Sequence, residues 1–338
     1  MKNIININQN FMDRNLALEF VRVTEAAAIA AAGWMGKGDK KRADRAAVKE
    51  MRARFNQINF QGTVVIGEGE KDEAPQLYTG EIVGKARFAT KARRGEKPIM
   101  DLAIDPLECT DSVAWGRYNA IAVIAAGPKG SLLHAPDTYM NKIAVGKEAA
   151  KVINLNAPIK ANLLRVAKAL DKDIKEVVVV VLDRPRHEKL IKEIRQAGAR
   201  VRLITDGDVA AAIATCLPES GIDVLMGIGG STEAVLAAVA VKVFGGEILC
   251  QFTPRGEKDL AKIKEALRQA KITNIKKNFH TEDLAKGDSL TFTATGVIEG
   301  PFLNGVLFKK DRIITHSVVI RAKSGTIRYI TTHHNIKK

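Results

Sequence analysis

The chain has 338 residues, a formal net charge of +15 and 46% hydrophobic residues, which is the composition of a globular protein rather than a disordered or fibrous one. No apolar run reaches the ~18 residues that a membrane-spanning helix needs, and the start, MKNIININQN, lacks the apolar region of a secretory signal. The cysteines, Cys109, Cys216 and Cys250, are odd in number and far apart. This spacing argues against a disulfide framework or a zinc site and indicates a reducing cytoplasm.

The positive charge suits an anionic ligand, which is either a small molecule or a nucleic acid. Only 5% of the residues are aromatic, and no basic run is interleaved with aromatic residues that would stack on bases. The densest basic run, residues 85–97, is typical of a solvated loop. We therefore expect an anionic small molecule as the ligand, and neither a nucleic acid nor a membrane as a partner.

Two helices are predicted near the N-terminus. Residues 14–35 carry apolar side chains at steps of three and four, and Gly36 ends this helix. Residues 39–58 have the same pattern, and Asp44 lies four residues before the apolar Val48, on the inward face of the first turns. An inward aspartate there either caps free backbone N–H groups or serves as a ligand, and the sequence alone favours the cap.

A β-branched strand at 62–66 runs into an acidic turn. Glu68 lies at the C-terminal end of this strand between two glycines, which permit close backbone approach, and Asp72 follows shortly after. Alone, the segment is compatible with a hairpin turn. Beside a second acidic turn, it supplies further carboxylates for a multi-metal site.

The second acidic turn, IMDLAIDPLECTD at 99–111, is the centre of the functional prediction. Its first half predicts a buried strand, and Pro106 is expected to end that strand because proline cannot donate a ladder hydrogen bond. Asp105, Glu108 and Thr110 then lie together at a strand end, where open α/β sheets bind ligands. Two carboxylates three residues apart suit Mg²⁺ or Mn²⁺, and the Thr110 hydroxyl can contact a water on such a cation. The alternative is a solvated acidic turn that caps a helix.

Residues 120–126 predict a buried strand, 127–130 a tight turn and 131–134 the hairpin partner of that strand. An irregular loop at 135–140 follows. Tyr139 in this loop is either half-buried core or a hydrogen-bond donor to a ligand, and the sequence does not choose between them.

From about residue 160 the pattern is regular β–α alternation, which predicts a parallel sheet. The expected strands are 177–182, 200–204 and 222–226, and the expected helices are 187–197, 208–216 and 231–243. The strand ends carry Arg184-Pro185-Arg186, Asp206-Gly207-Asp208 and the glycine turn 227–230. Each precedes a helix N-terminus, which favours an anion, so the three together predict a phosphorylated small molecule. A helix at 257–271, a strand at 289–296 and a hairpin turning at Ser324-Gly325 complete the scaffold.

These motifs together resemble one known family. The segments RVTEAAAIAAAGWMGKGDKKRAD, GTVVIGEGEKDEAP, DLAIDPLECT, LLHAPDTYMNKIAVG, RPRH, TDGDVAAAI and GIGGSTEAV stand in the order and spacing of the class II (GlpX-type) fructose-1,6-bisphosphatases. The resemblance covers about residues 13 to 332. It implies an α/β sugar-phosphatase fold of alternating α and β layers, akin to the inositol phosphatases. We expect a metal-binding α+β subdomain at 1–150 and a phosphate-binding α/β subdomain at 151–338.

The resemblance also implies an activity and the residues that carry it. Members hydrolyse the 1-phosphate of fructose 1,6-bisphosphate with Mn²⁺ or Mg²⁺, a gluconeogenic reaction of the cytoplasm, and commonly form homodimers or homotetramers. The implied metal ligands are Asp44, Glu68, Asp105, Glu108 and Glu233. The implied substrate-binding residues are Glu108, Cys109, Thr110, Tyr139, Arg184, Pro185, Arg186, Asp206, Gly207, Asp208 and Gly230. Thr110, Glu108 and Asp72 are the implied catalytic residues, with Thr110 helping to activate the attacking water.

The chain departs from the family pattern at three places: Cys109 replaces a usual glycine, Arg184 a frequent lysine, and Ser231-Thr232 a usual Ala-Pro pair. We expect Cys109 to adopt an ordinary negative φ, because a β-carbon disfavours the left-handed region. Two other functions are weighed. One is a dual fructose/sedoheptulose bisphosphatase, and the more remote one is a basic nucleic-acid-binding or metal-scavenging scaffold.

Overall fold

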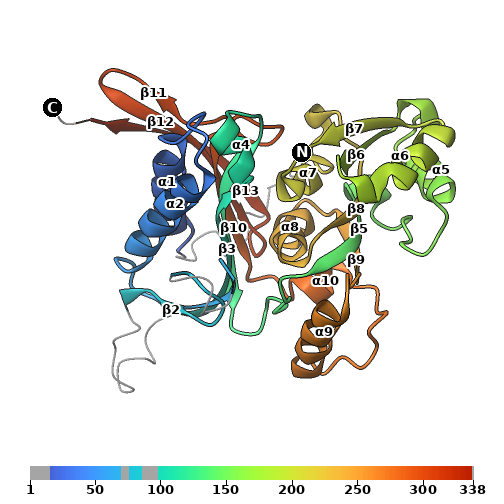
Figure 1. The fold of residues 1–338 in the computed structure, drawn as a ribbon, viewed down its shortest axis with the longest axis horizontal. Helices are drawn as coiled ribbons and strands as arrows, with labels where there is room; N and C mark the ends of the chain where they lie inside the picture. Colours follow the sequence, from blue (N-terminus) through green and yellow to red (C-terminus); the bar gives the residue numbers. More distant parts are fainter. Residues whose placement is uncertain (1–15, 70–75, 86–97, 337–338) are drawn as a thin grey trace, which may run out of the picture.

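The computed structural model describes residues 16–69, 76–85 and 98–336 of the chain (Figure 1). Asp72 and nearly all of the basic run 85–97 therefore lie outside the described residues. Within them, two sheets are separated and flanked by helices, so that helical and sheet layers alternate across the molecule (Figure 1). None of the helices in these ranges is long and apolar enough to cross a membrane.

The first sheet takes its strands from both ends of the chain. Its order is β11-β12-β10-β4-β3-β1-β2, with β13 paired to β12. The strands are β1 (Gln61–Ile66), β2 (Ile82–Val83), β3 (Ile99–Glu108), β4 (Ala120–Pro128), β10 (Thr291–Ile298), β11 (Leu307–Phe308), β12 (Arg312–Arg321) and β13 (Thr326–Asn335). The hairpin at Ser324-Gly325 is confirmed, because it joins β12 to β13. The division of the chain at residue 150 stays a prediction. The first sheet contains strands from both sides of that residue.

The second sheet has the order β7-β6-β8-β5-β9. Its strands are β5 (Tyr139–Val145), β6 (Val178–Leu182), β7 (Arg200–Ile204), β8 (Val224–Gly230) and β9 (Glu247–Phe252). The expected parallel pairing is right for β6 with β7 and β8, whereas β5 runs antiparallel to both β8 and β9. The glycine run at 227–230 is the end of β8 rather than a turn, because it pairs in register with β5.

Nine helices lie in the described ranges: α1 (Ala17–Ala32), α2 (Lys40–Phe55), α4 (Thr110–Trp115), α5 (Ile159–Ala169), α6 (Glu188–Gln196), α7 (Asp208–Ala214), α8 (Ser231–Val243), α9 (Glu257–Gln269) and α10 (Thr281–Leu284). Short 3₁₀ turns lie at Lys147–Ala149, Ile174–Glu176, Pro185–His187 and Pro218–Ser220.

Three clusters of buried hydrophobic residues hold the helices against the sheets. Phe20 of α1 and Phe55 of α2 pack edge to face on the outer side of the first sheet, in one cluster with Leu102 of β3. The apolar residues of α7 and α8 share a second cluster with Ala103 of the first sheet and Leu225 of the second, so these helices lie between the sheets. A third cluster joins α5 and α6 to the far side of the second sheet. The predicted fold of alternating α and β layers is confirmed.

Two local expectations are wrong. Strand β3 does not stop at Pro106 but runs on to Glu108, and its pairing with β4 shifts between Asp105 and Glu108. A bulge of this kind tolerates proline because the ladder is interrupted there. The turn at 128–131 forms, with the Ser131 N–H donating to the Pro128 carbonyl, but 131–134 is not the hairpin partner of β4. Both edges of β4 are already occupied, by β3 and β10.

Candidate active site

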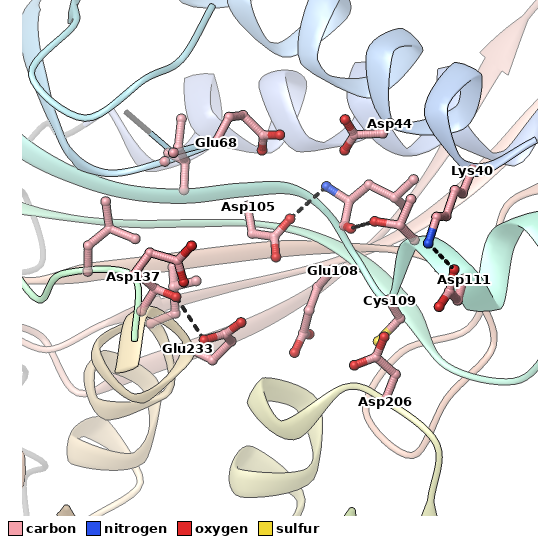
Figure 2. A pocket seen from close by; sticks show the side chains of 18 of the residues that line it. Lys40, Asp44, Glu68, Asp105, Glu108, Cys109, Asp111, Asp137, Asp206 and Glu233 are labelled. Carbon is pink, nitrogen blue, oxygen red and sulfur yellow. Dashed lines mark hydrogen bonds and ion pairs between the residues drawn. The ribbon is translucent and has the colours of Figure 1, made fainter. Parts of the chain in front are cut away.

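A cavity of about 550 Å³ opens where the first sheet meets the N-terminal ends of α7 and α8. Figure 2 shows that acidic side chains from both sides point into it. The acidic residues that line it are Asp44, Glu68, Asp105, Glu108, Asp111, Asp137, Asp206, Asp208 and Glu233. The expected metal ligands, which lie far apart in the sequence, are thus brought together in one place.

The bulge in β3 explains how both Asp105 and Glu108 reach this cavity. In a regular strand, residues three apart point to opposite faces of the sheet. The register shift between them inserts an extra residue and turns both carboxylates toward the cavity. The Leu107 N–H donates to Asp105 Oδ1 at 2.9 Å, and the Thr110 hydroxyl donates to the Leu107 carbonyl at 3.1 Å. Thr110 is thereby fixed at the start of α4, also on the cavity wall.

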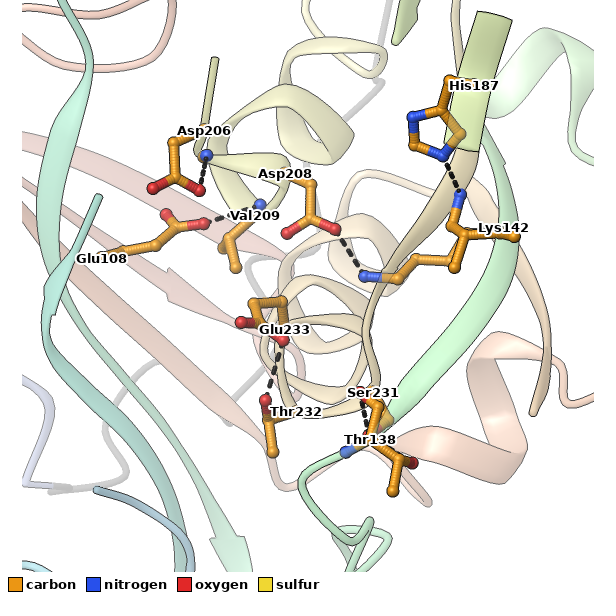
Figure 3. A network of polar contacts seen from close by, with 12 residues as sticks. Glu108, Thr138, Lys142, His187, Asp206, Asp208, Val209, Ser231, Thr232 and Glu233 are labelled. Atoms are coloured by element: carbon orange, nitrogen blue, oxygen red, sulfur yellow. Dashed lines mark hydrogen bonds and ion pairs between the residues drawn. The ribbon is translucent and has the colours of Figure 1, made fainter. Parts of the chain in front are cut away.

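Glu108 has one satisfied oxygen and one that is not. Its Oε1 accepts a hydrogen bond from the Val209 N–H at 3.0 Å, which links β3 to α7 (Figure 3). Its Oε2 is buried and has no hydrogen-bond partner among the described residues. A buried carboxylate oxygen without a partner is costly, so this atom is available to a cation or a donor that enters the cavity.

Cys109 contradicts the expectation of a negative φ. Its φ is 72° and its ψ 49°, in the left-handed region, at the N-cap position of α4. The chain passes from the end of β3 directly into α4, and Cys109 is the single residue between the two elements. Its side chain is 4% exposed, and Sγ lies 2.7 Å from where a β-carbon on Gly207 would be. Gly207, itself at φ 89°, therefore has to be glycine for Cys109 to fit.

The electrostatics of the cluster favour cations. Burial, together with the neighbouring Asp105 and Asp44 carboxylates, raises the pKa of Glu68 to about 9. Burial, with Glu233 as the next cause, raises the pKa of Asp105 to about 8. Each carboxylate would ionise readily only if positive charge arrived to offset its neighbours.

The donor set fits a hard divalent cation such as Mg²⁺ or Mn²⁺, because it consists of carboxylate oxygens and includes the unpartnered Oε2 of Glu108. As they stand, no three acidic, histidine or cysteine side chains of the described ranges form an assembled metal site.

A second group of predicted residues lies beside the cavity rather than on its wall. Arg186 donates through Nε and Nη2 to the Ile228 carbonyl, at 3.1 and 2.9 Å, and its Cζ lies 5.1 Å from the centroid of the Tyr139 ring. Tyr139 is the cross-strand partner of Gly230. A β-carbon on Gly230 would lie 1.7 Å from Glu233 Oε2. Gly230 therefore lies directly against a carboxylate that lines the cavity.

The other predicted residues lie on the α7 side of the cavity. Asp206 and Asp208 line it, and burial raises the pKa of Asp206 although the Arg184 guanidinium acts to lower it. Pro185 opens the short 3₁₀ turn that follows Arg184.

The structure adds residues that the sequence analysis did not single out. The Cζ of Arg255 lies 4.2 Å from the Tyr139 ring centroid, and nothing in the local pattern before α9 pointed to it. Lys40 and Asp137 line the cavity, and Lys40 forms an ion pair with Asp111 at 3.2 Å. Lys142 is 3% exposed in β5 and bonds Asp208. The single charged residue of the segment 139–145 was the signal available for it.

Comparison with known proteins gives one consistent result. Residues 14–334 match the family described as bacterial fructose-1,6-bisphosphatase, glpX-encoded. The chain is 44% identical over 331 residues to the class 2 fructose-1,6-bisphosphatase of Haemophilus influenzae, an alignment that covers 96% of this chain and 97% of the relative. It is 43% identical over 341 residues to fructose-1,6-bisphosphatase 1 class 2 of Escherichia coli K12, with 97% of each chain covered.

Proposed function

The chain belongs to the family of bacterial, glpX-encoded fructose-1,6-bisphosphatases, and from this premise we propose that it hydrolyses the 1-phosphate of fructose 1,6-bisphosphate to give fructose 6-phosphate and phosphate. The observation that carries the proposal is the convergence of Asp44, Glu68, Asp105, Glu108 and Glu233 on one cavity that also contains the Thr110 hydroxyl. Hydrolysis of a phosphate ester needs this combination of cation-binding carboxylates and a group that orients water.

Divalent cations, Mn²⁺ or Mg²⁺, complete this site in our proposal. The carboxylates of Asp44, Glu68, Asp105, Glu108 and Glu233 would hold them. When bound, such cations supply positive charge to the phosphoryl oxygens and make water nucleophilic at neutral pH. Thr110 then has one role: its oxygen, fixed by the bond to the Leu107 carbonyl, orients the attacking water against the phosphorus.

The basic residues beside the cavity bind the other end of the substrate. We assign the second phosphate to Arg184 and Arg186, since guanidinium groups bind phosphate through charge-assisted bonds. Tyr139 packs against Arg186 and donates its hydroxyl to the same phosphate. Asp206 and Asp208 accept hydrogen bonds from the sugar hydroxyls. Together these contacts orient the sugar so that its 1-phosphate lies at the carboxylate cluster.

Localisation and oligomeric state are two further parts of the proposal. We place the protein in the cytoplasm, and the three free thiols are in keeping with a reducing compartment. We also propose a homodimer or homotetramer, which light scattering of the purified protein would measure directly. The exposed edge of β13, with Tyr329 57% exposed, is a surface suited to such an assembly.

A phosphate-release assay tests the proposed function. Purified protein with fructose 1,6-bisphosphate and Mn²⁺ should release phosphate, EDTA should stop the release, and added Mn²⁺ or Mg²⁺ should restore it. Enzymatic detection of fructose 6-phosphate, rather than fructose 1-phosphate, identifies the bond that breaks. Asp311→Asn, which changes an exposed carboxylate that pairs with the neighbouring Arg312, is the control that should retain full activity. Absence of phosphate release with every divalent cation tried would overturn the assignment.

A further inference from the structure

Lys142 is a buried cation directly behind the acidic cavity. It lies in the middle of β5, opposite Gly227 of β8 and Cys250 of β9, and is 3% exposed. Its Nζ donates to Asp208 Oδ2 at 2.6 Å (Figure 3). An isolated ammonium group is costly to bury, so the Asp208 carboxylate is the partner that makes this position tolerable.

The backbone of β8 is shaped around this ion pair. A β-carbon on Gly229 would lie 2.0 Å from Asp208 Oδ2 and 3.0 Å from Lys142 Nζ. Gly229 is therefore glycine because the pair occupies the space that a side chain would take. The glycine run at 227–230, which the sequence suggested as an anion-binding turn, here makes room for a bond between β5 and the first residue of α7.

The pair also determines which oxygen of Asp208 faces the cavity. Oδ2 is taken by Lys142, and Figure 3 shows the other oxygen pointing toward the side where Glu108 lies. Asp208 lines the cavity together with Glu233. Burial acts to lower the pKa of Lys142, but the carboxylates of Asp208 and Glu233 outweigh it and raise the pKa above its ordinary value. The ammonium group thus stays charged.

We propose that Lys142 is a positioning residue for sugar-bisphosphate binding: it fixes Asp208 with one oxygen toward the cavity and offsets the negative charge of that carboxylate, so that an anionic substrate can approach it. This inference rests on the proposed function and concerns a residue that does not itself touch the substrate. Without Lys142, the Asp208 carboxylate repels the substrate phosphates and loses the orientation that the ion pair imposes.

The test is a double-mutant cycle on Lys142 and Asp208, read as KM and kcat for fructose 1,6-bisphosphate. Lys142→Met should raise KM at least tenfold and change kcat less, because uniform binding is lost. Asp208→Asn should raise KM as well. The double variant should have the KM of Asp208→Asn within about twofold, since a positioning residue has no further effect once its target is changed. Lys142→Arg, which keeps the charge, should recover part of the loss.

Lys172→Met is the matched control. Lys172 forms a more exposed ion pair with Asp223 at 2.5 Å, beside the opposite end of β8 from the glycine run, so KM should not change. If the single variant Lys142→Met does not fold, the proposal is tested by comparing the KM of Asp208→Asn with that of the double variant. The double variant lacks both buried charges, so it leaves neither of them unpaired. A folded Lys142→Met with wild-type KM, or a double variant whose KM differs fivefold from that of Asp208→Asn, would overturn the proposal. An inactive wild-type protein would instead overturn the proposed function.

Discussion

Removing divalent cations and raising the pH should destabilise this protein through its own active site. Between pH 4.5 and about 9 the native state keeps a proton on Glu68 that the unfolded chain has released, because burial and neighbouring carboxylates raise its pKa to about 9. The native state then binds more protons than the unfolded state, so the free energy of unfolding falls as pH rises. Asp105, whose pKa is raised to about 8, acts in the same direction up to that pH.

The size of the effect follows from the number of protons held. Each extra proton on the native state gives a slope of about 1.4 kcal/mol per pH unit. From pH 6 to pH 8, the metal-free protein should therefore lose about 3 kcal/mol if Glu68 keeps its proton, and Asp105 adds to the loss in the same direction. A divalent cation at 100 times its dissociation constant should restore about 2.7 kcal/mol.

Urea unfolding at pH 6, 7 and 8, followed by circular dichroism in EDTA and then in Mg²⁺, measures this loss. Glu68→Gln removes one titrating group and should flatten the slope in EDTA. Glu265→Gln is the control, because Glu265 is exposed and its ion pair with Arg268 lowers its pKa to about 2, far below this range. Stability in EDTA that stays level or increases from pH 6 to pH 8, or a slope unchanged in Glu68→Gln, would refute the reasoning.

Other substitutions separate the roles of the site residues. Glu108→Gln should lower phosphate release at least a hundredfold while the circular dichroism spectrum is unchanged; retained turnover would contradict its assignment as a metal ligand. In steady-state kinetics, Thr110→Ala should chiefly lower kcat, whereas Arg186→Ala should chiefly raise KM, and a near-normal kcat in Thr110→Ala would remove it from water activation. Cys109→Gly should keep its activity and its stability within about 1 kcal/mol, because relief of the positive φ offsets the lost burial of the thiol. It should also lose most of the parent's inhibition by Hg²⁺, and inhibition of both proteins alike would make another group the target.

Local patterns predicted most helices and strands and the acidic turns that carry Glu68, Asp105 and Glu108, whereas the alternating layers and the ligand roles of Asp44 and Glu233 came from the resemblance to the family. Periodicity located α1 and α2, and the β–α alternation located β6, β7 and β8. What the sequence analysis missed depends on contacts between distant segments. The extension of β3 past Pro106 depends on pairing with β4. The left-handed backbone of Cys109 depends on the bulge in β3 that this pairing contains. Lys142 acquires a role only once α7 brings Asp208 against β5.

The position of β10 in the first sheet affects how the protein is made. β10, near the C-terminus, pairs directly with β4, and the hydroxyl groups of Thr295 on β10 and Thr24 on α1 lie 2.7 Å apart. As the chain leaves the ribosome, β4 therefore has an unpaired edge until residues 291–298 emerge. The nascent N-terminal half exposes a strand edge for about half of translation and is open to chaperones during that time. A nonsense mutation that removes only the last fifty residues would leave every proposed metal ligand encoded and still remove β10, β11, β12 and β13, which are half of the strands of the first sheet.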